Sequence, residues 1–142
     1  MLSEMKNMQS FNTAQDHVMC FCGANSNYEN CCGQFHKGLQ FAPTAEALMR
    51  SRYSAYILCD SAYLLSTWYK NTRPKQLDFS QDILDWQKLE ILHTKKGNVK
   101  DDKGKVEFNA FYIQDGQLQV MHEISRFKKL GGKWFYVDGI LS

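Results

Sequence analysis

The sequence predicts an α+β protein in which helices come first and an antiparallel sheet follows. Between residues 44 and 69, apolar residues recur every three to four positions, as on one face of a helix. From residue 88 to residue 138 they recur at every second position, as in a half-buried strand, and short glycine-containing turns interrupt the pattern. Helices followed by hairpin-connected strands are typical of the α+β class.

Composition sets the limits of function. The 142 residues suffice for one domain and a small additional module, and 44% apolar residues exclude a disordered chain. The net charge of +2 is low for a nucleic-acid-binding domain. The longest apolar run, residues 53–59, is too short to span a membrane, and no signal segment is visible at the N-terminus. We therefore expect a cytoplasmic protein with no membrane partner.

The first half is expected to contain about three helices. Thr44 can cap a helix over residues 44–58, because an N-cap threonine accepts a hydrogen bond from the first turn. A second helix is expected over residues 61–69 and a short third one over 81–86. The inward face of the first helix follows from spacings of three and four: Leu48, Met49, Arg52, Tyr53, Tyr56 and Ile57.

The second half is expected to form an antiparallel sheet of about four strands. Asp115-Gly116 is a strong hairpin signal, and Gly131-Gly132 gives a second turn. The expected strands are residues 88–96, 105–114, 117–129 and 133–138.

Four of the five cysteines lie close together, as a C-x-C pair and a C-C pair separated by eight residues. They are Cys20, Cys22, Cys31 and Cys32. Four thiolates form the ligand set of a closed tetrahedral zinc site, and two close pairs on either side of a short loop can supply it. We therefore expect one zinc ion in a small knuckle over residues 20–37, after a mobile lead-in over 1–19 and before a main domain over 44–142.

Other interpretations of the cysteines stay open at this point. A disulfide or redox pair, or four unrelated thiols, would fit the same count, although a chain without an export signal disfavours disulfides. His36, four residues after Cys32, is the plausible substitute ligand, and a packed or solvent-facing histidine is the alternative. The fifth thiol, Cys59, is expected to be buried and unreactive.

The residues around the thiols resemble a known motif. The runs Cys20-Phe21-Cys22-Gly23 and Cys31-Cys32-Gly33 are similar to the SEC-C zinc motif, which also occurs at the C-terminal tail of the SecA translocation ATPase. Phe21 and Ala24 stand where the motif usually has proline and serine, but all four thiols are present.

Together with residues 44–56, 106–110, 122–127 and 134–139, the motif resembles the uncharacterised bacterial YchJ family over about residues 20–139. The resemblance implies a nuclear transport factor 2-like cone, in which a curved sheet wraps around a long helix and leaves a pocket between them. Many family members carry a second cysteine block at the C-terminus that is not seen here, so the resemblance implies a single zinc ion.

A small ligand would bind inside such a cone. Strand alternation places Glu123 and Phe127 on one face of the third strand, and His122 on the other, so His122 and Glu123 cannot share a pocket. Trp134 and Tyr136 share a face of the fourth strand. The expected pocket residues are Arg52, Tyr56, Phe108, Glu123, Phe127, Trp134 and Tyr136.

Glu123 is the candidate catalytic residue, because a positioned carboxyl group can act as a general acid or base. The alternative is a structural ion pair that holds the helix to the sheet. Of the two nearby arginines, Arg50 and Arg52, we expect Arg52 to form this pair with Glu123. The clustered lysines at 95, 96, 100, 103 and 105 are interpreted as a solvated turn, since acidic residues are interleaved with them.

The sequence therefore favours a zinc-binding protein with a binding function over an enzyme. The knuckle would contact a macromolecule, such as a protein or the ribosome, or the cone would hold a small molecule. The alternative is an isomerase or hydrolase that uses Glu123, and the fold alone does not decide between them. An open, partly wet cavity in which Glu123 lacks an arginine partner would favour the enzyme. A filled cone together with an exposed zinc knuckle would favour a binding or structural module.

Overall fold

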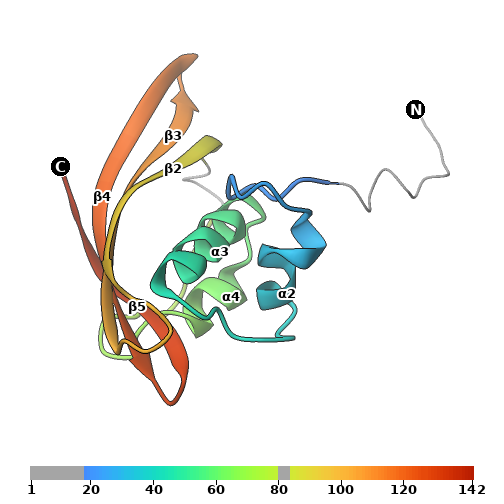
Figure 1. The fold of residues 1–142 in the computed structure, drawn as a ribbon. Helices are drawn as coiled ribbons and strands as arrows, with labels where there is room; N and C mark the ends of the chain where they lie inside the picture. Colours follow the sequence, from blue (N-terminus) through green and yellow to red (C-terminus); the bar gives the residue numbers. More distant parts are fainter. Residues whose placement is uncertain (1–17, 80–83) are drawn as a thin grey trace, which may run out of the picture.

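The computed structural model describes residues 18–79 and 84–142, and it has three layers (Figure 1). One layer is a four-stranded antiparallel sheet with the strand order β2-β3-β4-β5. Helix α3 (Ala45–Ile57) lies across its concave face, and the knuckle lies on the far side of α3. The predicted α+β class, with helices before a curved antiparallel sheet, is confirmed.

The sheet is a simple meander. Its strands are β2 (Asp85–Lys96), β3 (Lys103–Gln114), β4 (Gln117–Leu130) and β5 (Lys133–Leu141). At the β3–β4 turn, Asp115 and Gly116 both have positive φ angles, 53° and 76°, as a type I′ hairpin requires. At the β4–β5 turn, Gly131 and Gly132 also have positive φ angles, 57° and 80°. Both predicted turns are therefore present, and they fix the pairing of these strands.

The N-terminus of α3 forms as the sequence predicts. The hydroxyl of Thr44 accepts a hydrogen bond from the Ala47 amide at 3.0 Å, which caps the first turn. After α3, Asp60 caps the short helix α4 (Ser61–Ser66) by accepting from the Tyr63 amide. The chain then pairs with the edge of the sheet, since the Tyr136 amide donates to Thr67 O and the Tyr69 amide donates to Tyr136 O.

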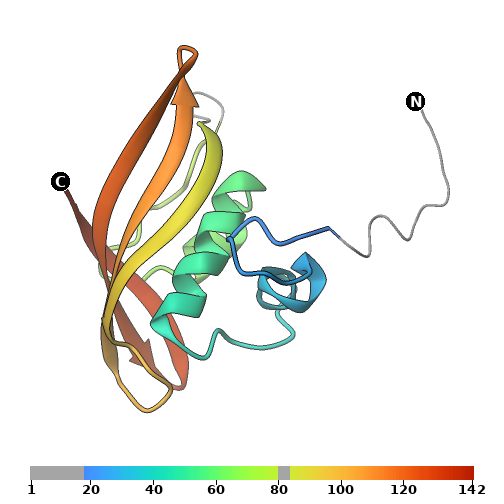
Figure 2. The same cartoon turned by 45° about the horizontal axis from the view of Figure 1, so that its top comes forward.

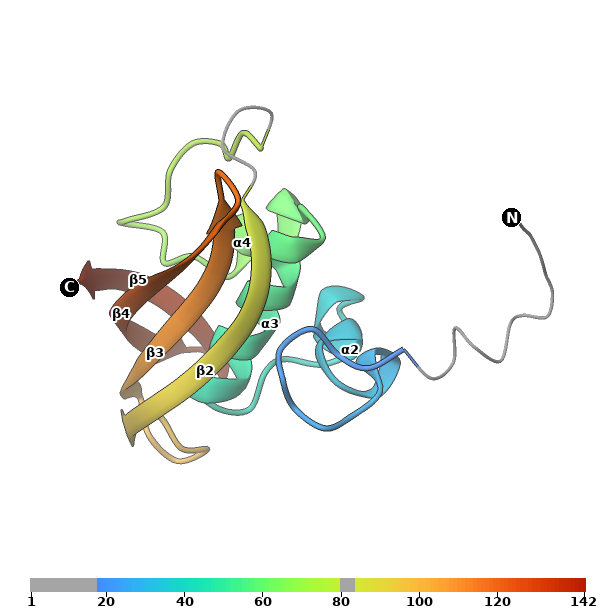
Figure 3. The ribbon, with the colours of Figure 1, turned by 90° about the horizontal axis from the view of Figure 1, so that it is seen from above.

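Helix α3 is an interior helix, not a surface helix with one apolar stripe. It packs on the sheet on one side and on the knuckle on the other (Figures 2 and 3). Its polar residues are therefore buried together with its apolar ones. The buried residues of α3 are Ala45, Leu48, Met49, Ser51, Arg52, Tyr53, Ser54 and Ala55.

The main core fills the space between α3 and the concave face of the sheet. From the sheet, Val106, Phe108, Phe127 and Trp134 contribute side chains that are at most 2% exposed. Each buried large apolar side chain stabilises the fold by roughly 1.5–3 kcal/mol relative to an exposed one.

Within the described residues, no helix is long and apolar enough to cross a bilayer.

One expected helix is wrong in part. Residues 81–86 were expected to be helical, but Asp85 and Trp86 already belong to β2, while 80–83 lie outside the described residues. Trp86 packs edge-on against Tyr53 and Tyr112, at ring distances of 6.0 and 5.5 Å, so tertiary contacts override the local pattern. The expected lead-in, residues 1–19, lies outside the described residues except for Val18 and Met19.

Two glycines allow α3 to approach the end of the β2–β3 hairpin. A Cβ atom at Gly104 would lie 2.5 Å from the Cα of Gly97, and 3.2 Å from the Cβ of Ala45. The Ala45 amide donates to Gly97 O at 3.0 Å. This close approach anchors the first turn of α3 to the sheet.

Substitution of Gly104 tests this contact. Gly104→Ala should lower the free energy of unfolding by about 1–3 kcal/mol, because the added methyl group overpacks the contact. Urea denaturation followed by tryptophan fluorescence would measure it. Asp102→Ala, an exposed change two residues away, is the control and should stay within about 0.5 kcal/mol of the parent. Equal stabilities of the two variants would contradict the close approach.

Candidate functional site

The four clustered cysteines meet at one point in the knuckle. The sulfur atoms of Cys20, Cys22, Cys31 and Cys32 all lie within 4.8 Å of one another, and the Sγ atoms of Cys22 and Cys31 are 3.7 Å apart. Tetrahedral zinc with sulfur ligands at about 2.3 Å places the sulfur atoms about 3.8 Å apart. All five cysteines of the chain are free thiols in the structure. The cluster thus has the dimensions of a four-thiolate metal site.

A short loop aims the first pair of thiols inward. The Cys20 amide donates to Ser26 O at 2.9 Å, and the Ala24 amide donates to Cys22 Sγ at 3.4 Å. Gly23, with a φ angle of 87°, provides the turn between these contacts. The second pair lies where helix α2 (Cys32–His36) begins, after the 3₁₀ turn η1 (Tyr28–Asn30).

The thiols cannot all ionise without a cation. Burial, followed by the charges of Cys22 and Cys20, raises the pKa of Cys31 to about 12. Hydrogen bonds to Cys20 and Cys22, and then burial, raise the pKa of Cys32 further. Hydrogen bonds with Cys22 and Cys32 lower the pKa of Cys20, because they stabilise its thiolate. A divalent cation would supply the charge that lets the remaining thiols ionise and coordinate it.

His36 does not join this cluster, because both of its ring nitrogens are occupied. Its Nε2 atom lies 2.8 Å from Ser51 O, to which it donates, and its Nδ1 atom lies 2.6 Å from the Tyr28 hydroxyl. The ring also packs against Tyr63 at 4.6 Å. Of the two roles considered for His36, the packed role is correct, and the histidine joins the knuckle to α3.

A second link ties the cysteine cluster to α3. Arg50 donates from Nη1 to Cys22 O at 2.7 Å and from Nε to Glu46 at 2.9 Å. On the next turn, the Ser54 hydroxyl lies 3.7 Å from Cys20 Sγ. The cluster is therefore fixed to the same helix that packs on the sheet.

A cavity of about 250 Å³ lies between α3 and the concave face of the sheet. Five of the seven expected pocket residues line it: Arg52, Tyr56, Phe108, Glu123 and Tyr136. The others do not. Phe127 and Trp134 are 2% and 1% exposed in the core, and Trp134 Nε1 donates to Pro43 O near the start of α3. They lie on the expected face of the sheet, but the space in front of them is filled.

Several residues that line the cavity were not among the expected pocket residues. Met121 and Ser125 lie on the same face of β4 as Glu123, so the period-two pattern could have named them. Tyr53 follows from the helical period of α3. Trp86 was missed because its segment was expected to be helical.

The expected ion pair between Arg52 and Glu123 is not formed. Arg52 is 3% exposed, and its Nη1 atom donates instead to Leu64 O and to the Thr67 hydroxyl, each at 2.7 Å. These groups lie at the C-terminus of α4, where unpaired carbonyls attract a cation. The guanidinium also lies 5.0 Å from the Trp68 ring and 4.6 Å from the Tyr136 ring. Cation–π contacts and carbonyl groups thus occupy Arg52.

Glu123 has hydroxyl partners instead of an arginine. Its Oε2 atom accepts from Ser125 at 2.5 Å and from the Tyr136 hydroxyl at 3.3 Å. Burial, and then the charge of Glu123, raises the pKa of Tyr136, so this hydroxyl stays protonated and can donate. A Cβ atom at Gly139 would lie 1.9 Å from Oε2, so a larger residue there would force the carboxylate to move.

Tyr53 provides an unpaired polar atom in the lining. Its side chain is buried, and its hydroxyl has no hydrogen-bond partner among the described residues. Burial raises the pKa of Tyr53 to about 12, so the hydroxyl is a donor at neutral pH. A buried donor without a partner costs about 1–3 kcal/mol, which a bound ligand could recover.

Two further residues are placed away from the cavity. Cys59 was expected to be buried, but it is exposed at the end of α3, with a φ angle of 56° that turns the chain toward α4. His122 lies on the opposite face of β4 from Glu123, as expected, where it contacts Glu107 at 2.6 Å and Ser142 at 2.5 Å.

The chain is similar in sequence to a known family model and to several known proteins. Residues 44–139 match the family model described as the YchJ middle NTF2-like domain. A UPF0225 protein of Streptomyces coelicolor is 49% identical over 120 residues, which cover 84% of this chain and 93% of that protein. A UPF0225 protein of Bordetella pertussis is 45% identical over 123 residues, which cover 84% of this chain and 90% of that protein.

Two solved structures are similar in fold. The solution structure of a SEC-C motif-containing protein from Rhodopseudomonas palustris has a TM-score of 0.78 at 32% identity, over 88% of this chain and 99% of that chain. The crystal structure of a SEC-C motif-containing protein from Psychrobacter arcticus has a TM-score of 0.72 at 27% identity, over 91% of this chain and 85% of that chain.

The position of Arg52 gives a stability prediction. Arg52→Ala should lower the free energy of unfolding by about 3–5 kcal/mol, because it opens a cavity and leaves Leu64 O without its charged donor. Arg52→Lys should lower the free energy of unfolding by less, since lysine keeps the positive charge. Urea denaturation would measure both changes, and Arg73→Ala, in an exposed loop, is the control that should match the parent. An Arg52→Ala protein as stable as the control would contradict the assigned contacts.

Proposed function

The chain belongs to the UPF0225 family, whose middle domain is the YchJ-type NTF2-like domain, and on this basis we propose that it is a zinc-stabilised protein that binds a small molecule in its cone. Cys20, Cys22, Cys31 and Cys32 would hold one zinc ion. The observation that carries the zinc assignment is the packing of four thiol sulfurs within 4.8 Å. The SEC-C names of the structural neighbours support it.

The zinc is proposed to be structural. All four coordination positions would be filled by thiolates, which leaves none open for substrate, and three of the four cysteines are buried. Free thiols are typical of a reducing compartment, which supports a cytoplasmic location.

Metal analysis of purified protein tests the zinc assignment. We expect one zinc per chain, and Cys22→Ser or Cys31→Ser should lower the zinc content at least tenfold when free chelator competes. Cys59→Ser and His36→Ala are the matched controls, because Cys59 is exposed and His36 binds protein atoms. Both should keep one zinc per chain. Zinc retained in the Cys22 and Cys31 variants, or lost in His36→Ala, would overturn the assignment.

Support for ligand binding comes from the cavity. Its walls include the rings of Tyr53, Tyr56, Trp86 and Phe108, and its polar groups are the unpaired Tyr53 hydroxyl and the Glu123 carboxylate. A flat ring bearing one donor and one acceptor suits such a lining. The Glu123 carboxylate disfavours an anionic ligand.

Benzamide is a suitable probe, because its ring can pack among the aromatic walls and its amide can pair with Glu123 and Tyr53. We expect saturable shifts of amide NMR signals from Met121 to Ser125, with a dissociation constant of about 1 mM. Ala110→Leu, which fills the cavity, should abolish them, and Ala62→Leu, on the exposed surface of α4, should not. Shifts that persist in Ala110→Leu would place the probe elsewhere and contradict the proposal.

A specific observation favours the enzyme as the second candidate. Glu123 faces the cavity without an arginine ion pair within the described part of the chain, as a general acid or base would. Turnover of p-nitrophenyl acetate above the buffer rate that disappears in Glu123→Gln would establish this candidate. Equal rates in the two proteins would exclude this esterase reaction.

A contact between the knuckle and a macromolecule is a separate proposal. The knuckle buries one side on α3 and exposes Val18, Met19 and Phe21 on the other, at 44%, 51% and 37%. A protein partner or a ribosomal protein would meet the knuckle at these side chains.

A further inference from the structure

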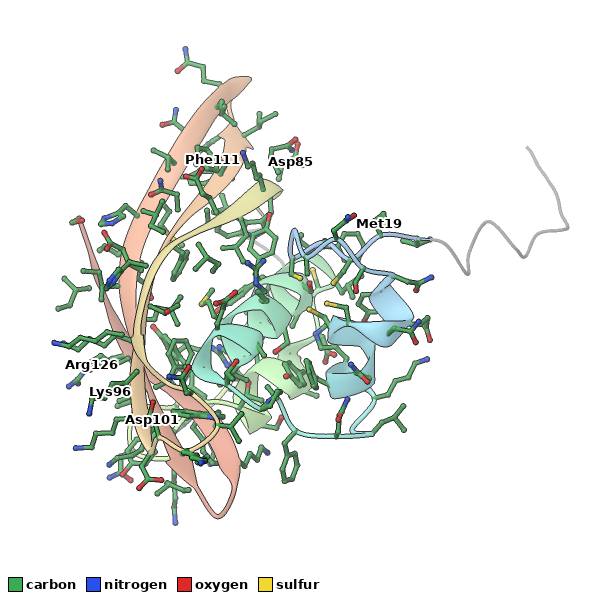
Figure 4. All side chains as sticks on the ribbon, viewed as in Figure 1. Met19, Asp85, Lys96, Asp101, Phe111 and Arg126 are labelled. Carbon is green, nitrogen blue, oxygen red and sulfur yellow. The ribbon has the colours of Figure 1, made fainter. Side chains whose placement is uncertain are left out.

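The outer face of the sheet carries a basic groove of about 340 Å³. Among the described residues no helix covers this face, and Figure 4 shows Arg126 and Lys96 on the side of the sheet that faces away from the helices. Six cationic side chains line the groove: Lys95, Lys96, Lys103, Lys105, Arg126 and Lys128. The low net charge of the whole chain conceals this local concentration of cations.

Strand register places these cations directly opposite one another. Lys95 pairs with Lys105, and Lys105 with Arg126, so one row of positive charge crosses three strands. Lys103 pairs with Lys128 in a second row. Neighbouring strands are about 4.8 Å apart, and like charges directly opposite each other destabilise a sheet. The groove therefore costs the fold stability as long as no anion lies in it.

Nearby carboxylates do not neutralise the lysines. Asp138 forms a two-pronged ion pair with Arg126, with both contacts at 2.6 Å. Glu107 contacts His122, and Asp101 accepts from the Asn98 amide. Among the described residues, no carboxylate lies within ion-pair distance of the five groove lysines. Five unpaired positive charges thus face solvent together.

We propose that the basic groove binds the phosphate backbone of a single-stranded nucleic acid. Rows of cations across adjacent strands match a chain of phosphates, and binding would release its counterions. Aromatic rings border the groove: Tyr69 lies 4.9 Å from Lys128 Nζ, and Phe135 pairs with Lys128 across β4 and β5. Such half-buried rings can stack a base, which favours a single strand over a duplex. This inference goes beyond the proposed zinc and cavity functions and does not depend on them.

Fluorescence anisotropy with a fluorescein-labelled oligouridylate of about ten nucleotides tests the groove on the full chain. Wild-type protein should bind at low salt, and log affinity should fall with log salt concentration with a slope of about −3, from roughly −0.7 per contacted phosphate. Lys105→Glu/Lys128→Glu should weaken binding at least tenfold. The control Lys37→Glu/Lys88→Glu changes the net charge equally, but Lys37 directly follows α2 and Lys88 lies at the other end of β2. The affinity of this control should stay within about twofold of wild type.

Stability provides a second readout on the same variant. Because Lys105 and Lys128 each lie opposite other cations, Lys105→Glu/Lys128→Glu should raise the melting temperature by about a few degrees while it weakens binding. Three results would overturn the proposal. They are no wild-type binding at low salt, equal loss of affinity in both double variants, and tighter binding of poly-L-glutamate than of the oligouridylate, which would indicate an acidic protein partner.

Discussion

Helix α3 is covered on three sides, and the rest of the structure depends on this arrangement. The sheet covers one side, α4 a second and the knuckle a third, so that eight of its thirteen residues are buried. Three of these residues are Ser51, Arg52 and Ser54, which need polar partners away from water. The neighbours supply them: the Ser51 carbonyl accepts from His36, Ser54 lies beside Cys20, and Arg52 donates to α4. The knuckle is therefore a structural cover as well as a candidate metal site.

The same arrangement explains the chemistry of the cavity. Because Arg52 is occupied by the end of α4 and by two aromatic rings, Glu123 remains free of a cation and turns to Ser125 and Tyr136. The hydroxyl of Tyr53, the residue after Arg52, has no hydrogen-bond partner among the described residues. Core packing that fills the space at Phe127 and Trp134 confines the cavity to the other end of the cone. The Glu123 carboxylate and the Tyr53 hydroxyl therefore favour a neutral ligand, or a ligand that donates hydrogen bonds.

Sequence patterns predicted the fold and the thiol cluster well, because both depend on local spacing. Thr44, Asp115-Gly116 and the C-x-C and C-C pairs each specify their structure within a few residues. The failures involve contacts between distant segments. Trp86 was expected in a helix but pairs with β3, Arg52 binds α4 and not Glu123, and Cys59 is exposed by a left-handed turn. The basic groove needed the register of three strands, which the run of lysines does not show.

Hydrogen–deuterium exchange of the zinc-loaded and chelated protein tests the central claim, that metal holds the knuckle as the cover of α3. A segment as short as residues 20–37 has no apolar core of its own, and metal binding supplies roughly 10–16 kcal/mol in isolated zinc fingers. On chelation, protection should be lost in residues 20–36 and reduced at the knuckle-facing amides of α3, around Ser51 and Ser54, while β3 and β4 keep theirs. Unchanged protection in the knuckle, or simultaneous loss across the whole sheet, would contradict the account.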